Sequence, residues 1–458
     1  MPNSFDAIII GTGQSGPPLA GRLTAAGMRV AIIERKLFGG TCVNTGCIPT
    51  KALIASAKAI HMARRAADYG FQTGTLTVDM QAVKARKDRI VAASNQGVEQ
   101  GLRGMKNCTV YQGHARFESP RTVRVSDEVL EAGKIFINVG ARATKPAFAG
   151  LDTVPFLTNS SIMAMDFLPR HLLILGGSYI GLEFGQMYRR FGSQVTILER
   201  ADRLISHEDP DISDAIRKIL ENEGIHVFTS ADVHDVAQRD GQIVCNFSVN
   251  GVNREIPGSH LLVATGRVPN TDDLGLDRAG VAVDVRGYIQ VDDQLRATVP
   301  GIWAMGDCNG RGAFTHTSYN DFEIVAANLL DNDPRRVSDR ILAYNLYIDP
   351  PLGRCGMSES AVRKSGRRAL IGTRPMTRVA RAVEKGETQG FMKVLIDAEN
   401  KLILGASLLG VECDEVIHSL LDIMYARAPY TVIQRAVHIH PTVSELIPTL
   451  LGELKPLE

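Results

Sequence analysis

Residues 7–16 of the chain read AIIIGTGQSG, and this short stretch decides the fold. Its apolar start is typical of a buried strand, and Gly11, Gly13 and Gly16 then form a turn. A helix-like run follows the turn, and a second apolar strand ends at Glu34. Strand, glycine turn, helix and strand in this order predict a βαβ unit, the building block of parallel sheets.

The same pattern occurs a second time at residues 172–181, which read LLILGGSYIG. Gly176 and Gly181 occupy the places of the first and third glycines, Ser178 replaces the middle one, and Glu199 ends the following strand. In such a unit the glycines let the backbone approach a pyrophosphate, the helix N-terminus faces the anion, and the acid binds the adenosine ribose. The repeat therefore predicts two dinucleotide-binding domains of the Rossmann type.

The composition is that of an ordinary globular protein, with 458 residues, 44% of them hydrophobic, and a formal net charge of +1. This length predicts about three domains. The balanced charge gives no reason to expect nucleic acid or a membrane surface as a partner. Apolar runs are too short for a membrane span, and the N-terminus lacks the basic region of a signal peptide. Because seven cysteines are too few for a secreted disulfide scaffold, we expect a cytoplasmic protein.

Two cysteines lie five positions apart in residues 39–51, which read GGTCVNTGCIPTK. In a regular helix such positions are roughly 8–9 Å apart at Cα, whereas a disulfide needs about 4.4–6.8 Å. A disulfide between Cys42 and Cys47 therefore requires a distorted turn, for which Gly46 supplies backbone freedom. A helix predicted over Thr50–Tyr69 would follow, and its N-terminus would stabilise a thiolate at Cys47. Such a pair is typical of a catalytic, redox-active disulfide.

Taken together, the motifs resemble those of the class I pyridine nucleotide-disulfide oxidoreductases, the family of dihydrolipoamide dehydrogenase, glutathione reductase and mercuric reductase. The resemblance runs nearly from end to end and is carried, in family order, by residues 11–16, 40–51, 176–183, 264–267, 304–307 and 440–445. It implies an α/β fold with two Rossmann-like dinucleotide-binding domains and a C-terminal α+β dimerisation domain. The FAD-binding domain would cover residues 1–148 and 270–335, the NAD(P)-binding domain 149–269, and the dimerisation domain 336–458.

The resemblance also implies roles for individual residues. FAD would be bound by Gly11, Gly13, Gly16, Glu34, Thr41, Lys51, Gly140 and Asp307. The nicotinamide nucleotide would be bound by Gly176, Gly181, Glu199 and Gly266. Lys51 would pair with Glu183 beside the flavin. Cys47 would be the flavin-facing thiolate, and Cys42 would be the exposed sulfur that exchanges with substrate.

A histidine and a glutamate near the C-terminus complete the predicted site. Thiol–disulfide exchange needs an acid and a base, and the imidazole of His440 titrates near neutral pH. Glu445 would hold that ring in the correct tautomer, as a third group orients the base in other triads. The resemblance implies that this pair comes from a partner subunit and faces the disulfide, so the active unit would be a homodimer. We expect the neighbouring His438 to be a packing residue.

The choice between NADH and NADPH rests on few residues. Glu199 would accept the 2′-hydroxyl of NADH and repel the 2′-phosphate of NADPH, which favours NADH. Arg200 and Arg203 follow closely and could pair with that phosphate, so NADPH stays an alternative.

The predicted function is an FAD-dependent NAD(P)H oxidoreductase that passes electrons through Cys42 and Cys47 to a small disulfide, dithiol or metal-ion substrate. Three alternatives stay open: a mercuric or other metal-ion reductase, a dihydrolipoamide dehydrogenase, and a flavin-bound redox sensor with little turnover. The chain lacks the paired C-terminal cysteines of mercuric reductases, and a sensor would not need His440 and Glu445. The five other cysteines lack metal-ligand spacing, so no metal site is expected; they would pack, with Cys355 as an alternative second reactive thiol.

Overall fold

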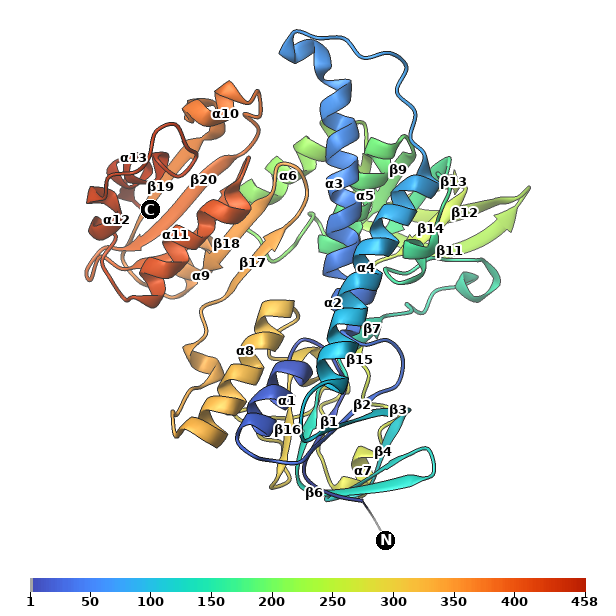
Figure 1. Cartoon of the computed structure of the whole chain (residues 1–458). Coiled ribbons are helices and arrows are strands. Elements are labelled where there is room, and N and C mark those ends of the chain that lie inside the picture. Colours follow the sequence, from blue (N-terminus) through green and yellow to red (C-terminus); the bar gives the residue numbers. More distant parts are fainter. Residues whose placement is uncertain (1–2) are drawn as a thin grey trace.

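The computed structural model describes residues 3–458, and the first two residues of the predicted FAD-binding domain lie outside the described part of the chain. Figure 1 shows three parts: a lower one with the blue N-terminal and the yellow segments, a green one at the right, and an orange-red one at the left. These parts confirm the predicted fold class, an α/β protein with two Rossmann-like units and a C-terminal α+β unit.

The lower part is built on a seven-stranded sheet in the order β3-β2-β1-β6-β5-β4, with β16 also paired to β6. Strands β1, β2, β3, β6 and β16 run parallel, so their carboxyl ends meet at one edge. In open sheets of this kind, ligands bind beyond those ends. The strands are β1 (Asn3–Ile10), β2 (Val30–Glu34), β3 (Cys108–Gln112), β4 (Ala115–Ser119), β5 (Thr122–Val125), β6 (Glu128–Ile137) and β16 (Ile302–Ala304).

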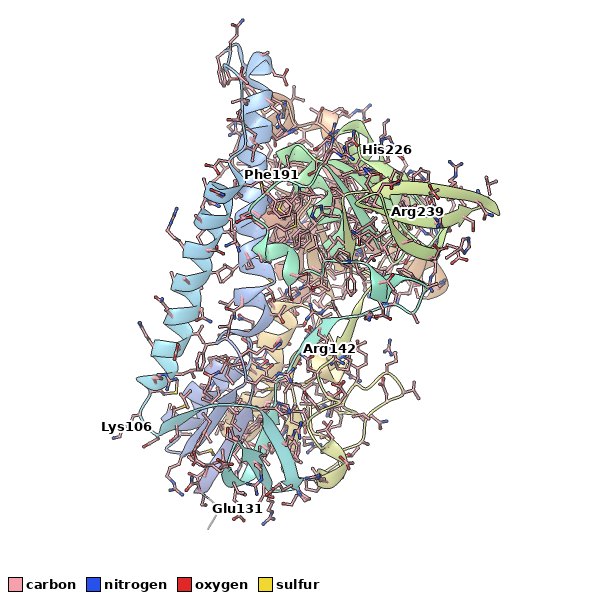
Figure 2. All side chains as sticks on the ribbon, turned by 90° about the vertical axis from the view of Figure 1, so that its right-hand side faces the viewer. Lys106, Glu131, Arg142, Phe191, His226 and Arg239 are labelled. Atoms are coloured by element: carbon pink, nitrogen blue, oxygen red, sulfur yellow. The ribbon has the colours of Figure 1, made fainter. Side chains whose placement is uncertain are left out.

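Six α-helices belong to this part of the described chain. Helix α1 starts directly after the glycine turn and packs Leu19 and Leu23 among the apolar side chains of β1 and β2. The long helices α3 and α4 lie side by side and rise towards the other two parts (Figures 1 and 2). The helices are α1 (Gly16–Ala25), α2 (Gly40–Asn44), α3 (Cys47–Arg64), α4 (Met80–Arg103), α7 (Leu276–Ala279) and α8 (Thr315–Ala326).

The helix predicted over Thr50–Tyr69 has different ends in the structure. It begins earlier, at Cys47, because the first turn of a helix tolerates Pro49 and Gly46 supplies the non-helical residue before it. It ends at Arg64, and a separate 3₁₀ turn covers Ala66–Tyr69. Cys47 is therefore the first residue of the helix rather than the residue before it.

The green part repeats the βαβ pattern on a four-stranded parallel sheet in the order β10-β9-β8-β14. Strand β8 leads through the second glycine turn into helix α5, as predicted. Figure 2 shows Arg239 on the β11–β12 hairpin, which projects away from the rest of the molecule. The elements are β8 (His171–Leu175), α5 (Tyr179–Phe191), β9 (Gln194–Leu198), α6 (Pro210–Asn222), β10 (His226–Phe228), β11 (Ala231–Arg239), β12 (Gln242–Val249), β13 (Val252–Gly258) and β14 (His260–Val263).

The chain crosses between these two parts at a short two-stranded ribbon. There, β7 (Ala141–Ala143) pairs antiparallel with β15 (Arg267–Pro269). Arg142, in this ribbon, lies between the two parts in Figure 2. The predicted domain boundaries at 148/149 and 269/270 fall beside the ribbon and stay predictions.

The C-terminal part is an antiparallel six-stranded sheet in the order β17-β18-β21-β20-β19-β22. Helices α11 and α13 contribute Leu420 and Ile447 to the same core as Val394 and Leu408 of the sheet. The elements are β17 (Ala343–Leu346), β18 (Leu352–Gly356), α9 (Glu359–Lys364), β19 (Ala369–Pro375), α10 (Ala380–Glu384), β20 (Phe391–Asp397), β21 (Ile403–Leu409), α11 (Cys413–Tyr425), α12 (Thr431–Arg435), α13 (Leu446–Gly452) and β22 (Lys455–Pro456).

Candidate active site

A cavity of about 1910 Å³ is lined by residues from all three parts of the molecule. This volume exceeds the ~300–1,000 Å³ of ordinary small-molecule pockets and leaves room for a dinucleotide. The predicted residues that line it are Gly11, Gly13, Glu34, Thr41, Cys42, Cys47, Lys51, Gly140, Glu183 and Asp307. Within the described residues, the lining does not include Gly16, Gly176, Gly181, Glu199, Gly266, His440 or Glu445.

A buried carboxylate ties the first glycine turn to the end of β2. Glu34 accepts hydrogen bonds from the N–H and the hydroxyl of Thr12, at 3.1 and 2.7 Å, and from the Lys36 N–H at 2.9 Å. Gly11 runs so close to β6 that a Cβ would lie 2.2 Å from the Asn138 carbonyl oxygen, and its φ of +104° also favours glycine. Because a carboxylate has further lone pairs, Glu34 can still accept a ribose hydroxyl.

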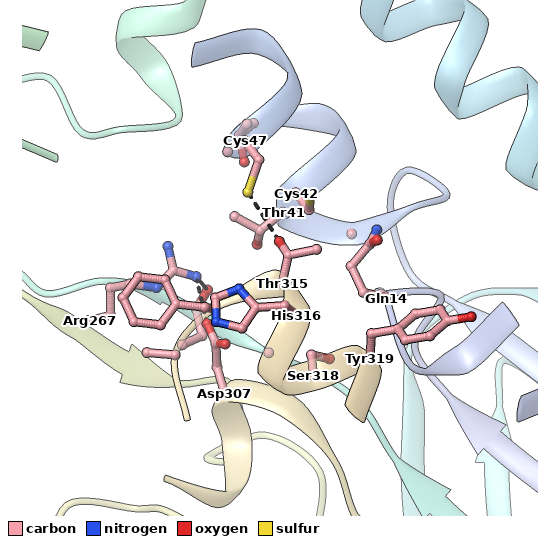
Figure 3. A pocket seen from close by; sticks show the side chains of 18 of the residues that line it. Gln14, Thr41, Cys42, Cys47, Arg267, Asp307, Thr315, His316, Ser318 and Tyr319 are labelled. Carbon is pink, nitrogen blue, oxygen red and sulfur yellow. Dashed lines mark hydrogen bonds and ion pairs between the residues drawn. The ribbon is translucent and has the colours of Figure 1, made fainter. Parts of the chain in front are cut away.

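A second set of polar groups lies at the ends of β6 and β16. Asn138 is buried beside Gly13, and its amide nitrogen has no hydrogen-bond partner within residues 3–458. Asp307 pairs with Arg267 at 3.3 Å (Figure 3), and burial raises the pKa of the Asp307 carboxyl. An unpartnered donor beside a glycine turn and a carboxylate on the cavity wall fit the polar groups of FAD.

The two cysteines lie on separate helices that meet at a break. Helix α2 ends at Asn44 and α3 begins at Cys47. Between them, Gly46 lies so close to the preceding helix that a Cβ would be 2.8 Å from the Thr41 carbonyl oxygen. The break is the distorted turn that the spacing of Cys42 and Cys47 requires, and both residues are free thiols in the structure.

The two thiols differ in acidity. Figure 3 shows Cys47 directed from the start of α3 towards Thr315, whose hydroxyl lies 3.1 Å from the sulfur. A hydrogen bond from Cys42, together with the Thr315 hydroxyl and the positive charge of Lys51, lowers the pKa of Cys47 to about 6 although burial opposes this. The same hydrogen bond and burial raise the pKa of Cys42. At neutral pH, Cys47 is therefore the thiolate of the pair.

The exposure of the two cysteines differs from the expectation. The sequence predicts Cys42 as the exposed sulfur, whereas in the single chain Cys47 is exposed and Cys42 is half-buried. The reason is that Cys47 is the first residue of α3, whereas Cys42 sits inside α2, although both residues line the cavity.

Lys51 and Glu183 meet although 132 positions separate them in the sequence. Lys51 Nζ donates to both carboxylate oxygens of Glu183, at 2.7 and 3.0 Å, and lies 4.5 Å from the centre of the Tyr347 ring. The Glu183 side chain is only 7% exposed and also accepts the Tyr347 N–H at 3.0 Å. An exposed salt bridge would be worth little, but this pair is partly buried and both carboxylate oxygens of Glu183 accept hydrogen bonds.

The second glycine turn is held in the same way as the first. Glu199, directly after β9, accepts the Gly177 N–H at 2.5 Å and a second backbone N–H at 2.7 Å. A Cβ on Gly181 would lie 2.0 Å from the Gly176 carbonyl oxygen, so helix α5 and the turn pack closely. The turn therefore presents the N-terminus of α5 to a ligand, as the first turn presents α1.

Two further predicted glycines lie beside the crossing ribbon. The Gly140 carbonyl accepts the Asn270 N–H at 3.0 Å, and the Gly266 carbonyl accepts the Thr144 N–H at 2.9 Å. Gly140 lines the cavity. Gly266 does not, but the next residue, Arg267, does.

An aromatic cluster that the sequence analysis missed lines the cavity at the first turn of α5. The Tyr179 ring stacks on His207 with centres 5.9 Å apart, and meets Phe314 and Tyr344 edge-on at 5.6 and 5.5 Å. Burial raises the pKa of Tyr179 to about 12, while a hydrogen bond with Tyr344 acts in the opposite direction. No local pattern signals this cluster, because its members come from all three parts of the molecule.

His440 and Glu445 form their predicted pair on the surface of the C-terminal part. His440 Nδ1 lies 2.8 Å from Glu445 Oε2, and the His440 side chain is 74% exposed. Its neighbours Val437 and Ile439 are 100% and 80% exposed, while His438 is half-buried. Exposed apolar side chains around an oriented imidazole are typical of a surface that a protein partner covers.

The other five cysteines are packing residues. Cys245, Cys308, Cys355 and Cys413 are buried, and Cys108 is half-buried. Burial raises the pKa of Cys355 to about 12, and the residue lies in the core of the C-terminal sheet although its neighbours Arg354 and Gly356 line the cavity. This placement argues against Cys355 as a second reactive thiol.

Across residues 3–458, no helix combines the length and the apolar character that crossing a membrane requires. In the same part of the chain, no three His, Cys, Asp or Glu side chains are grouped so that they could hold a metal ion.

The fold and the cysteine-bearing cavity are those of a known family of enzymes. Residues 5–321 match the family model of the pyridine nucleotide-disulphide oxidoreductases, and residues 342–451 match the dimerisation domain of the same family. The chain belongs to the pyridine nucleotide-disulphide oxidoreductase family, which confirms the resemblance found in the sequence.

Relatives of this family span nearly the whole chain. The probable pyridine nucleotide-disulfide oxidoreductase RclA from Escherichia coli is 36% identical, over 99% of this chain and 100% of the relative. A mercuric reductase from Streptomyces lividans is 33% identical, over 97% and 94%. A dihydrolipoyl dehydrogenase from Thermus scotoductus is 32% identical, over 96% and 95%.

A solved structure is similar over the same extent. The Cu(II) complex of the HOCl-induced flavoprotein disulfide reductase RclA from Escherichia coli gives a TM-score of 0.90 at 35% identity, covering 98% of this chain and 99% of that one. Together these matches confirm that the chain is an FAD-dependent NAD(P)H oxidoreductase of the disulfide type with a C-terminal dimerisation domain.

Proposed function

We propose that Cys42 and Cys47 are the redox-active pair of this enzyme, that NADH is its reductant, and that a small disulfide is its substrate. FAD bound in the cavity would supply the two-electron chemistry that links the nicotinamide to the Cys42–Cys47 disulfide. The observation that carries the proposal is the thiol of Cys47, which opens onto the cavity with a pKa lowered to about 6. The net reaction would convert NADH, a proton and one disulfide into NAD⁺ and two thiols.

The acidity of the two thiols assigns their roles. Cys47, the better thiolate, would face the flavin, and Cys42 would attack the substrate disulfide and release one thiol. Because the pKa of Cys42 is raised, this attack needs a base, and His440 of the partner subunit supplies it. The imidazole passes the proton of Cys42 to the first thiol. Cys47 then attacks the Cys42 sulfur, which reforms the disulfide and releases the second thiol, and this thiol takes the one proton of the net reaction from solvent.

The two turns would hold the two nucleotides. Gly11, Gly13, Gly16, Glu34, Thr41, Gly140 and Asp307 would bind FAD, with Lys51 and Glu183 beside the flavin. Gly176, Gly181, Glu199 and Gly266 would bind the nicotinamide nucleotide. Both acids accept backbone N–H groups of their turns, which supports this assignment, since each turn is held in the shape that a pyrophosphate requires.

NADH is favoured over NADPH by the fixed carboxylate of Glu199, which would lie against a 2′-phosphate. Arg203 Nε lies 3.4 Å from Asp202 Oδ1, so this carboxylate competes with that phosphate for the guanidinium. We expect kcat/KM for NADH to exceed that for NADPH at least fivefold. Equal or reversed values would assign Arg200 and Arg203 to phosphate binding.

Metal-ion reduction is the second candidate function. A Cu(II) complex of the RclA relative has been solved, and this chain is similar to that protein along nearly its whole length. The Cys42–Cys47 dithiol would be the electron donor to such an ion, which would be a substrate rather than a resident metal. Dihydrolipoamide oxidation, the same machinery run backward, stays the third candidate because of the dihydrolipoyl dehydrogenase relatives.

Anaerobic titration of the flavin-loaded protein with NADH tests the core of the proposal. We expect the flavin to bleach and a long-wavelength charge-transfer absorption with the Cys47 thiolate to appear. Folded, flavin-loaded protein that shows no such absorption would contradict the proposed cycle. NADH oxidation measured with lipoamide, glutathione disulfide, Hg(II) and Cu(II) then ranks the substrates, and turnover with none of them would favour a redox sensor.

We further propose a homodimer in the cytoplasm. The dimerisation domain and the exposed His440 surface support the dimer, and sedimentation analysis measures it. The free, buried thiols fit a reducing compartment, and cell fractionation tests the location.

A further inference from the structure

The charge of Lys51 is held by two residues from other parts of the molecule. Its ammonium group donates to both carboxylate oxygens of Glu183, at 2.7 and 3.0 Å, and lies 4.5 Å from the centre of the Tyr347 ring. An ammonium group has three donors, so one is left for the face of the ring after the two hydrogen bonds. Because the Lys51 side chain is 35% exposed, these contacts rather than tight packing decide where its charge lies.

Tyr347 is anchored without the help of Lys51. It directly follows β17, and its backbone N–H donates to Glu183 at 3.0 Å. Its hydroxyl accepts a hydrogen bond from the side-chain amide of Asn345 at 3.3 Å. The residue is therefore fixed at its backbone and at the tip of its side chain, and the face of the ring can support the ammonium group.

The same segment is tied to two helices by Asp349, two residues further along. The Asp349 N–H donates to the side-chain oxygen of Gln186 on α5 at 2.7 Å. The Asp349 carboxylate pairs with Arg190 on α5 at 2.6 Å and with Lys58 on α3 at 3.1 Å. Arg190 is buried, so solvent screens its ion pair little. The segment therefore keeps its place relative to both helices.

Lys51 acts on the reactive thiol of its own helix. Cys47 and Lys51 lie four residues apart on α3, so their side chains share one face of the helix, and both line the cavity. A hydrogen bond from Cys42 lowers the pKa of Cys47 most, and the Thr315 hydroxyl adds to this. The positive charge of Lys51 lowers the same pKa, whereas burial and the charge of Glu183 raise it. In the proposed dimer, the imidazole of the partner subunit also faces the two cysteines.

We propose that Tyr347 is a positioning residue whose ring holds the ammonium group of Lys51 and so keeps that charge on the face of α3 that carries Cys47. This inference rests on the proposed function, in which Cys47 is the thiolate beside the flavin. The face of an aromatic ring attracts a cation through the quadrupole of the ring. Without the ring, the partly exposed ammonium group would turn into water and away from the thiolate.

The test measures the acidity of Cys47 in the flavin-loaded dimer after reduction with dithiothreitol. Alkylation by iodoacetamide is followed as a function of pH, and mass spectrometry of the peptide distinguishes Cys47 from Cys42. In the wild-type protein the Cys47 thiolate should be half formed near pH 6. Tyr347→Leu should raise this midpoint by about half a unit, so that about a quarter of Cys47 is thiolate at that pH. Tyr347→Phe keeps the ring and should leave the midpoint unchanged.

A trifluorinated phenylalanine at position 347 keeps the test valid if Tyr347→Leu fails to fold. Fluorine withdraws electron density from the face of the ring with little change of its shape, so the midpoint should rise relative to Tyr347→Phe. Tyr69→Leu is the matched control, because Arg65 lies 5.6 Å from the centre of the Tyr69 ring and both residues lie outside the cavity lining. This control should not move the midpoint.

Substitution of Lys51 shows whether Tyr347 acts through that residue. Lys51→Met should itself raise the midpoint, because the charge is lost, and Tyr347→Leu should add nothing in that background. Additive shifts, equal shifts in Tyr347→Phe and Tyr347→Leu, or an unchanged midpoint in folded Tyr347→Leu would overturn the inference.

Failure of the inference is distinguishable from failure of the proposed function, because the alkylation needs no NADH. If NADH does not bleach the flavin of the wild-type protein, the proposed cycle fails. The midpoints of the variants at position 347 still decide the role of Tyr347.

Discussion

The two halves of the proposed catalytic machinery differ in how completely one chain builds them. The cysteine half is finished within the chain: Cys47 lies 3.1 Å from the Thr315 hydroxyl, and its pKa is already lowered to about 6. The imidazole half is oriented but open, because His440 Nδ1 lies 2.8 Å from Glu445 while 74% of the side chain is exposed. The cysteine half lines a cavity, whereas the imidazole half lies on the surface.

This difference indicates which part of the molecule positions the reacting atoms of each half. The break between α2 and α3 is only a few residues long, so local sequence alone can place the two sulfur atoms. The segment that carries His440 and Glu445 is enough to fix the tautomer of the imidazole. A second copy of the chain is needed to bring that imidazole beside a disulfide. Electron uptake should therefore depend on one chain, whereas turnover of substrate should depend on two.

The largest effect is expected from a substitution of Cys42, which separates electron uptake from substrate turnover. Cys42→Ser should lower disulfide turnover about 10³-fold or more, because the attacking sulfur is lost. The serine hydroxyl can still donate to Cys47, so FAD content and flavin reduction by NADH should stay normal. Stopped-flow reduction and steady-state turnover measure the two steps separately. Normal turnover of disulfides would show that Cys42 is not the exchanging sulfur.

The next largest effect belongs to the imidazole half. His440→Gln should lower turnover about 10²-fold, the usual contribution of a general base, because the pKa of Cys42 is raised. Flavin content and reduction by NADH should not change. A variant with normal turnover at all pH values would mean that another group deprotonates Cys42.

Co-expression of the two variants tests whether the halves come from different chains. In a mixed dimer, one site would combine an intact Cys42 with an intact His440. Random pairing should then restore about a quarter of wild-type activity, since half of the dimers are mixed and each has one intact site. No recovery in demonstrably mixed dimers would place both halves of a site in one chain.

A smaller effect is expected from the surface around His440. Ile439→Asp places a charge on an exposed apolar residue beside the imidazole, and should weaken the dimer and lower turnover about tenfold at low protein concentration. Higher protein concentration should recover part of the loss. Val285→Asp, at a fully exposed valine outside the dimerisation domain, is the control and should change neither property.

The sequence predicts most of what is local and little of what the tertiary structure brings together. Both βαβ units follow from glycine spacing and strand patterns, and their strands lie where those patterns predict. The partners Thr315 and Asn138 carry no such signal, since each acquires its role only when distant strands and helices meet.

Cys355 illustrates the same limit within one strand. The sequence leaves Cys355 open as a second reactive thiol, yet successive residues of β18 face opposite sides, so Arg354 and Gly356 reach the cavity and Cys355 packs in the core. The sequence alone does not tell which face is which.

The smallest expected effect sharpens the comparison on the cysteine side, where the acidity of Cys47 comes from neighbours in its own chain. In the reduced enzyme, thiolate absorbance should be half developed near pH 6, because a lowered pKa means that the thiolate persists above that pH. Thr315→Ala removes one hydrogen bond to the thiolate and should move this midpoint upward by about one unit. His440→Gln should move the midpoint less than Thr315→Ala does, because the imidazole is proposed to act on Cys42, whereas the pKa of Cys47 is lowered by Cys42, Thr315 and Lys51 of its own chain. A midpoint that moved with His440 instead of Thr315 would mean that the partner subunit, and not the cavity, sets the acidity of the pair.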